Sequence, residues 1–189
     1  VAIVGRCDRY PEARWKAFAL GVSLAALCVT VLDLLRPDWA GAGLILGSIV
    51  TVLAAGAANA LAAHHLPAYA RIYIRHNRAE AEARQYAESM FLTRGLFTTP
   101  KRTGVLILVG LFERAVVVHP DVGFADRIQG KEWRGIVEVM TAALLAGQQA
   151  AAFESGFVAL EALLDRKGFA TGGTATNTLP DTPSEKEGA

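Results

Sequence analysis

The chain has 189 residues and carries 19 Lys and Arg against 18 Asp and Glu, so its formal net charge is +1. This balance argues against a general nucleic-acid-binding protein, which needs a basic excess to neutralise phosphates. The two cysteines, Cys7 and Cys28, are too few for a disulfide framework or a cysteine-based zinc site. The chain opens on Val1 rather than Met, from which we expect either processing or an incomplete start.

Two long apolar stretches lie near the start of the chain, after a short apolar run and a basic arm. Residues 17–35 contain one charged side chain, Asp33, and residues 39–63 contain none. Each stretch is long enough to cross a hydrocarbon core of about 30 Å as a helix. Because the connector of residues 36–38 is so short, the two spans are predicted to form a transmembrane helical hairpin.

The second apolar stretch is rich in glycine and alanine. Small residues let helices approach closely in lipid, where packing takes over from the hydrophobic effect. The sequence leaves open whether this surface serves only the hairpin or also a partner helix. The residues assigned to a partner interface are Gly43, Gly47, Gly56 and Asn59.

Cationic residues flank the hairpin on both sides, with four in residues 1–16 and four in residues 71–84. The positive-inside tendency therefore predicts that both ends of the chain lie in the cytoplasm, at a bacterial inner (cytoplasmic or intracytoplasmic) membrane. His64 and His65 end the second span. Such histidines can ligate haem or the magnesium of chlorophyll, although histidines at an interface need no special role.

The stretch KRTGVLILVGLFERAVVVH, residues 101–119, predicts a β-hairpin rather than a third span. Its apolar runs are too short to cross a membrane as a helix, and they are dense in residues that favour buried strands. The pair Glu113-Arg114 divides the stretch into strands over 104–111 and 115–119.

Amphipathic helices are predicted on both sides of this β-hairpin, one ending near Gly95 and two ending near Gly147 and Gly168. The apolar run at residues 1–4 is expected to pair with the strand at 104–111. The predicted fold class is therefore α/β (α+β), a small mixed sheet flanked by amphipathic helices with an inserted two-helix transmembrane hairpin. The predicted divisions are a first strand and basic arm at 1–16, the hairpin at 17–63, the rest of the α/β domain at 64–170, and a disordered tail at 171–189.

Several motifs resemble those of the TPM domain family. They are RTGVLILV at 102–109, ER at 113–114, VVV at 116–118, DVGF at 121–124 and, after the first strand, DRYP at 8–11. Some members of that family carry a transmembrane hairpin after the first strand. The resemblance covers nearly everything except the tail, but the family's usual opening helix is missing here.

The resemblance implies membrane association and a link to photosystem assembly or repair. It also implies an acid phosphatase activity proposed for some members, and divalent metal binding at acidic loop residues. The matching positions are Asp8, Glu113 and Asp121. Asp8 and Asp121 are the candidate metal ligands, and Asp121 is the candidate catalytic residue. Because neighbouring arginines favour simple ion pairs, solvated loop charges remain the alternative.

Motifs of known enzymes are otherwise missing, because the sequence contains no G-x-S-x-G, P-loop, G-x-G-x-x-G or C-x-x-C. The sequence therefore favours a membrane-anchored accessory or structural subunit over an enzyme. Its hairpin and cytoplasmic α/β domain would bind and stabilise a larger integral membrane protein complex in the lipid bilayer, and the resemblance suggests a photosynthetic one. The alternative is a membrane-tethered phosphatase-like hydrolase, or an assembly or repair factor.

Overall fold

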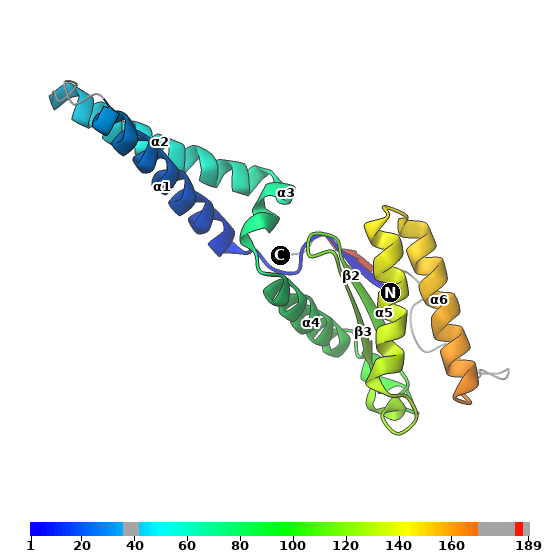
Figure 1. Cartoon of the computed structure of the whole chain (residues 1–189). Coiled ribbons are helices and arrows are strands. Elements are labelled where there is room, and N and C mark those ends of the chain that lie inside the picture. The colour runs from blue at the N-terminus through cyan, green and yellow to red at the C-terminus, as the bar shows by residue number, and fades with distance from the viewer. Residues whose placement is uncertain (36–41, 170–183, 187–189) are drawn as a thin grey trace. The chain divides into compact units, whose positions relative to one another are not determined.

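The computed structural model describes residues 1–35, 42–169 and 184–186 (Figure 1). It divides the chain into two compact units. The first, here called the α/β unit, joins Val1–Asp8 to Asn77–Ala189, and the second, here called the hairpin unit, is Arg9–His76. The hairpin unit is thus an insertion in the sequence of the α/β unit.

The sheet of the α/β unit is mixed, as predicted. Three of its strands are β1 (Ala2–Val4), β2 (Val105–Gly110) and β3 (Ala115–Pro120). β1 runs parallel to β2 with Val4 opposite Gly110, whereas β3 runs antiparallel to β2. The predicted β-hairpin and the predicted pairing of residues 1–4 with the strand at 104–111 are therefore confirmed.

The C-terminal segment predicted to be disordered, residues 171–189, lies outside the described residues except for three positions. These form β4 (Ser184–Lys186), whose backbone pairs in parallel with β1 on the side away from β2. The strand order is β3-β2-β1-β4.

One face of the sheet is covered by α4 (His76–Thr93), as Figure 1 shows. Leu106 and Leu108 of β2 point to this face and join a buried cluster with Ala83 and Ala87 of the helix. The small alanines let the helix lie close to the sheet, and the larger Met90 and Phe91 fill the space at its end.

The opposite face is covered by α5 (Gly130–Leu145) and α6 (Gln149–Arg166) (Figure 1). Ile107 and Val109 of β2 point to this face, because successive side chains of a strand alternate between faces. Trp133 of α5 packs in the same cluster, as the helical spacing of the apolar residues predicts. The α/β unit is therefore a sheet between two helical layers.

The predicted helix ends are confirmed by the backbone at three glycines. Gly95, Gly147 and Gly168 have φ angles of 61°, 77° and 73°, in the left-handed region that glycine adopts without strain. The described residues also contain three short 3-10 turns. They are η2 (Arg71–Tyr73), η3 (Leu96–Thr98) and η4 (Val122–Phe124).

The hairpin unit contains α1 (Pro11–Leu35), α2 (Ala42–His65) and the short α3 (Pro67–Ala70). α1 and α2 pack closely at Gly21 and Gly56. A Cβ at Gly21 would lie 2.8 Å from the carbonyl oxygen of Ala55, and one at Gly56 would lie 2.6 Å from a methyl group of Val22. These two glycines therefore permit the contact of the two helices.

A matched pair of glycine substitutions tests the packing inside the α/β unit, that is, of the segments around its sheet. A Cβ at Gly104 would lie 2.2 Å from the carbonyl oxygen of Leu96, so Gly104→Ala must displace backbone. We expect it to lower the free energy of unfolding by about 1–3 kcal/mol. Gly135 of α5 has open space around its Cβ position, and Gly135→Ala should raise stability by about 0.5–1 kcal/mol.

The measurement is urea unfolding of the detergent-solubilised protein, with Trp15→Phe and Trp39→Phe in every sample, followed by the fluorescence of Trp133 in the core. A Gly104→Ala protein as stable as the wild type would contradict the packing described here.

Candidate functional site

The candidate acidic residues lie at opposite ends of the sheet. Asp8 follows β1, whose end pairs with Gly110, whereas Asp121 follows β3, whose end pairs with Val105. The length of β2 separates these ends by roughly 17 Å at about 3.3 Å per residue. Asp8 and Asp121, the candidate metal ligands, therefore cannot ligate one metal ion together.

Asp121 is held in a bidentate ion pair with Arg102. The guanidinium Nε and Nη2 atoms each lie 2.9 Å from a carboxylate oxygen, and the Asp121 side chain is only 2% exposed. The backbone N–H of Val122 donates a further hydrogen bond to the same carboxylate at 2.7 Å. The pair connects the loop before β2 to the turn after β3.

The hydrogen bonds from Arg102 lower the pKa of Asp121, and the backbone of Val122 adds to this effect. A carboxylate with a lowered pKa is a poor proton acceptor near neutral pH. Its oxygens are also already engaged by Arg102 and Val122. The geometry therefore favours a structural role for Asp121 over the catalytic role predicted from the sequence.

The other end of the sheet contains a buried thiol and carboxylate. Glu113, in the turn between β2 and β3, accepts a hydrogen bond of 2.9 Å from the backbone N–H of Cys7. Both residues are 7% exposed. A Cβ at Gly110 would lie 2.8 Å from a Glu113 oxygen and 3.2 Å from the Cys7 sulfur, so glycine leaves room for this contact.

Burial raises the pKa of the Cys7 thiol, and the nearby charge and hydrogen bond of Glu113 raise it further. The thiol therefore stays protonated at neutral pH. Since the thiolate is the nucleophilic form of cysteine, Cys7 is poorly suited to covalent catalysis.

Asp8 lies near the same end of the sheet and pairs with a cation of α4. Arg78 has a guanidinium nitrogen 3.7 Å from Asp8 and 3.5 Å from Glu82. The sequence predicts ion pairing of the acidic loop residues with neighbouring arginines, among them Arg6 and Arg9. The guanidinium group of Arg6 lies 4.2 Å from the centre of the Phe112 ring. Within the described residues, no three His, Cys, Asp or Glu side chains are grouped to hold a metal ion.

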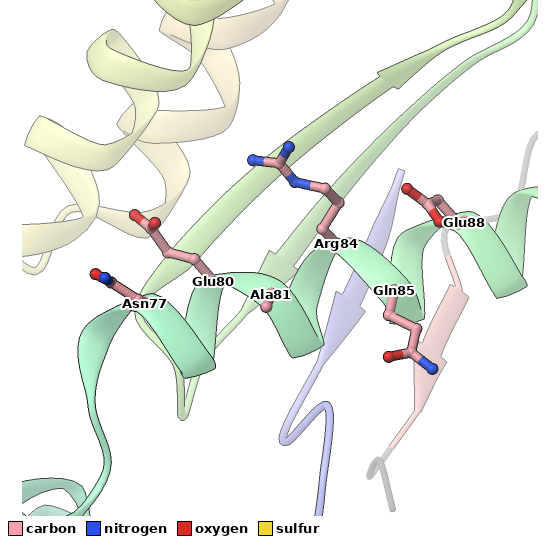
Figure 2. A pocket seen from close by; sticks show the side chains of 6 residues that line it. All are labelled: Asn77, Glu80, Ala81, Arg84, Gln85 and Glu88. Atoms are coloured by element: carbon pink, nitrogen blue, oxygen red, sulfur yellow. The ribbon is translucent and has the colours of Figure 1, made fainter.

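The outer face of α4 carries a shallow hollow that is open to solvent (Figure 2). Its polar side chains all extend from this one helix, with the strands behind it, so the hollow is open rather than enclosed. Acidic and basic groups alternate along this face, which is typical of a solvated helix surface. The lining residues are Asn77, Glu80, Ala81, Arg84, Gln85 and Glu88.

The structure separates the four residues assigned to a partner interface into two sets. Gly56 is buried against Val22 and Phe18 of α1, and Asn59 donates a hydrogen bond of 2.7 Å to the Ala17 carbonyl. Both therefore serve the contact inside the hairpin.

Gly43 and Gly47 behave differently, because a Cβ at either would meet nothing within 4 Å. Of the four residues, these two leave space for another helix.

His64 and His65 are exposed at the end of α2, with their ring centres 4.7 Å apart in an edge-to-face arrangement. Their exposure leaves the ring nitrogens accessible. A role for them in holding haem or chlorophyll stays a prediction.

The surfaces of α1 and α2 are apolar and open. Both helices are long and apolar enough to cross a membrane, and the most apolar 18-residue window has a mean hydropathy of 2.3 in α1 and 2.0 in α2. None of the first window and 6% of the second is buried inside the structure. A core helix of a soluble protein would be mostly covered, so these helices need cover from lipid or from another protein.

Comparison with known proteins supports the fold of the chain. No family model and no curated protein matched. Among solved structures, the chain is similar to the NMR structure of BA42 from the psychrophilic bacterium Bizionia argentinensis. The match has 20% identity and a TM-score of 0.51, and covers 55% of this chain and 71% of that chain. This likeness shows the fold alone, which is TPM-like.

The lowered pKa of Asp121 predicts a pH dependence of stability. A carboxylate whose pKa is lowered by folding stabilises the native state above its unfolded pKa of about 3.9. This contribution is lost as the pH falls through the lower folded pKa. We therefore expect Asp121→Asn to be less stable than the wild type at pH 7, and to lose less stability than the wild type between pH 5 and about pH 2.

The measurement is the urea midpoint of the solubilised protein across this pH range. Asp126→Asn is the matched control, because Asp126 is exposed and makes no ion pair with any residue that the structure describes. Parallel pH profiles for wild type and Asp121→Asn would show that the ion pair of Asp121 with Arg102 does not cause the loss of stability at low pH.

Proposed function

We propose that this protein is a membrane-anchored accessory subunit that binds and stabilises a larger integral membrane protein complex. The observation that carries the proposal is the uncovered apolar surface of a long helical hairpin inserted into the sequence of a folded α/β unit. Lipid covers most of this surface, and a partner helix covers the open glycine positions of α2.

Chain connectivity supports the anchoring role. The hairpin unit begins at Arg9, directly after the β1 segment, and ends at His76, where the rest of the α/β unit begins. Two antiparallel spans return the chain to the membrane face from which it entered. The α/β unit is therefore tethered by two chain connections and stays close to one face of the membrane.

The α/β unit supports docking rather than catalysis. Its buried thiol is protonated at neutral pH, and the carboxylate of Asp121 is engaged by Arg102. A phosphatase-like reaction has no comparable support from the geometry, and an assembly or repair role stays the alternative.

In this proposal the α/β unit lies on the cytoplasmic side of a bacterial inner membrane, an expectation supported by the basic residues that flank the hairpin. The expected partner is a transmembrane helix that packs against Gly43 and Gly47, because small residues permit close helix approach in lipid. A photosynthetic complex as that partner is an expectation from the TPM resemblance alone.

A bulky residue in the open glycine surface provides the test. Gly47→Leu should leave the hairpin itself intact, since nothing lies within 4 Å of the added Cβ. We expect it to reduce recovery of a large membrane complex by tenfold or more when the tagged protein is purified from native membranes in mild detergent. Recovered proteins are identified and quantified by mass spectrometry.

Ser23→Leu is the matched control, because it adds similar bulk to an exposed position of α1. It should keep stoichiometric recovery of the partner. Recovery of the wild-type chain without any stoichiometric membrane partner would contradict the subunit proposal. Equal recovery of the partner by wild type and Gly47→Leu would show that the surface around Gly43 and Gly47 does not bind the partner.

A further inference from the structure

We propose that the base of the hairpin unit binds the headgroups of anionic phospholipids. This base comprises residues 14–16 of α1 and residues 66–75, which follow α2. The inference rests on the proposed function, in which the hairpin is inserted in a membrane. It adds the class of lipid that the base of the hairpin binds.

Hydrogen bonds bring the two segments of the base together. Lys16 donates from its ammonium group to the Tyr73 carbonyl at 2.9 Å. Tyr73 donates from its hydroxyl to that of Tyr69 at 2.8 Å, and Tyr69 donates in turn to the side-chain oxygen of Asn59. The first turns of α1 and the turn η2 are therefore fixed beside each other at one end of the hairpin.

Large apolar side chains of the base remain exposed. The exposed fractions are 72% for Trp15, 56% for Leu66 and 74% for Ile72. Such residues next to a pair of apolar spans indicate the boundary between acyl chains and headgroups, where tryptophan and tyrosine are enriched. The tyrosine hydroxyls of the hydrogen-bonded chain are polar groups suited to the same depth.

The charge of the base is positive. Residues 14–16 and 66–75 contain Arg14, Lys16, Arg71 and Arg75, and no Asp or Glu. The side chains of Arg14 and Arg75 are exposed, and neither forms an ion pair with a residue that the structure describes. Their guanidinium groups are therefore available to a ligand from outside the chain.

A phosphodiester headgroup fits this combination of groups. Guanidinium groups bind phosphate oxygens through paired charge-assisted hydrogen bonds, and basic groups near a span attract anionic lipids. The exposed apolar side chains beside the arginines would contact the glycerol and upper acyl region of the same lipid. A soluble anion would satisfy the arginines but would leave Trp15, Leu66 and Ile72 in water.

The test measures which lipids gather near Trp15. The protein, with Trp39→Phe in every sample, is reconstituted in phosphatidylcholine bilayers that contain a minor fraction of brominated lipid. The brominated lipid is either phosphatidylglycerol or phosphatidylcholine at equal mole fraction. Trp133 is 7% exposed in the core of the α/β unit, so lipid bromines quench mainly Trp15.

We expect phosphatidylglycerol to quench at least twofold more than phosphatidylcholine in the parent protein. Arg14→Gln combined with Arg75→Gln should remove this preference. The control combines Lys131→Gln with Arg134→Gln, which removes the same charge from exposed positions of α5 and should keep the preference.

Strong but equal quenching by the two lipids would overturn the headgroup proposal while leaving membrane insertion intact. Weak quenching by both would overturn insertion and the headgroup proposal together. A preference that survives in the Arg14/Arg75 variant, or that disappears in both double variants, would also overturn it, because the base would then not be the selective surface.

Discussion

The backbone hydrogen bonds between β1 and β2 join segments that are about one hundred residues apart, with Ala2 opposite Leu108 and Val4 opposite Gly110. Everything between these segments must leave the sheet and return to it. The hairpin unit lies within that excursion, so its two ends lead into one folded unit. The same pairing brings Cys7 to Glu113 and buries the start of the chain under α4. Loss of β1 would therefore affect the anchoring and the core at once.

Within the hairpin, glycine contact and polar contact act together. Gly21 and Gly56 let the helix backbones approach, and Asn59 then reaches the Ala17 carbonyl of the opposite helix. A buried amide is costly in an apolar environment unless it is hydrogen-bonded, so this bond favours one register of the two helices. Tyr69 extends the same network to the end of the hairpin. Packing and hydrogen bonding thus specify the hairpin.

Much of the fold could be predicted from local patterns. The apolar runs at 101–119 were too short for a span and rich in strand-forming residues, and the glycines that end the helices adopt the expected left-handed conformation. The candidate site could not be assembled in this way. Whether Asp8 and Asp121 meet depends on strand direction, which no single-sequence pattern specifies. The Arg78 partner of Asp8 is far away in the sequence. One feature of the hairpin could have been predicted from helical spacing. Gly56 and Asn59 lie three residues apart, so they share the face of α2 that contacts α1.

The account depends most directly on two spans that place the connector of the hairpin and the α/β unit on opposite sides of a membrane. Cysteine variants test this in a background that lacks Cys28 (replaced by alanine) and keeps the buried Cys7, with Asp38→Cys in the connector or Glu154→Cys on the exposed surface of α6. The same background without an added cysteine is the control for labelling of Cys7. Intact cells are treated with a membrane-impermeant maleimide before and after lysis. The account predicts labelling of Asp38→Cys in intact cells and of Glu154→Cys only after lysis. Labelling of both positions from the same side would contradict a membrane-spanning hairpin.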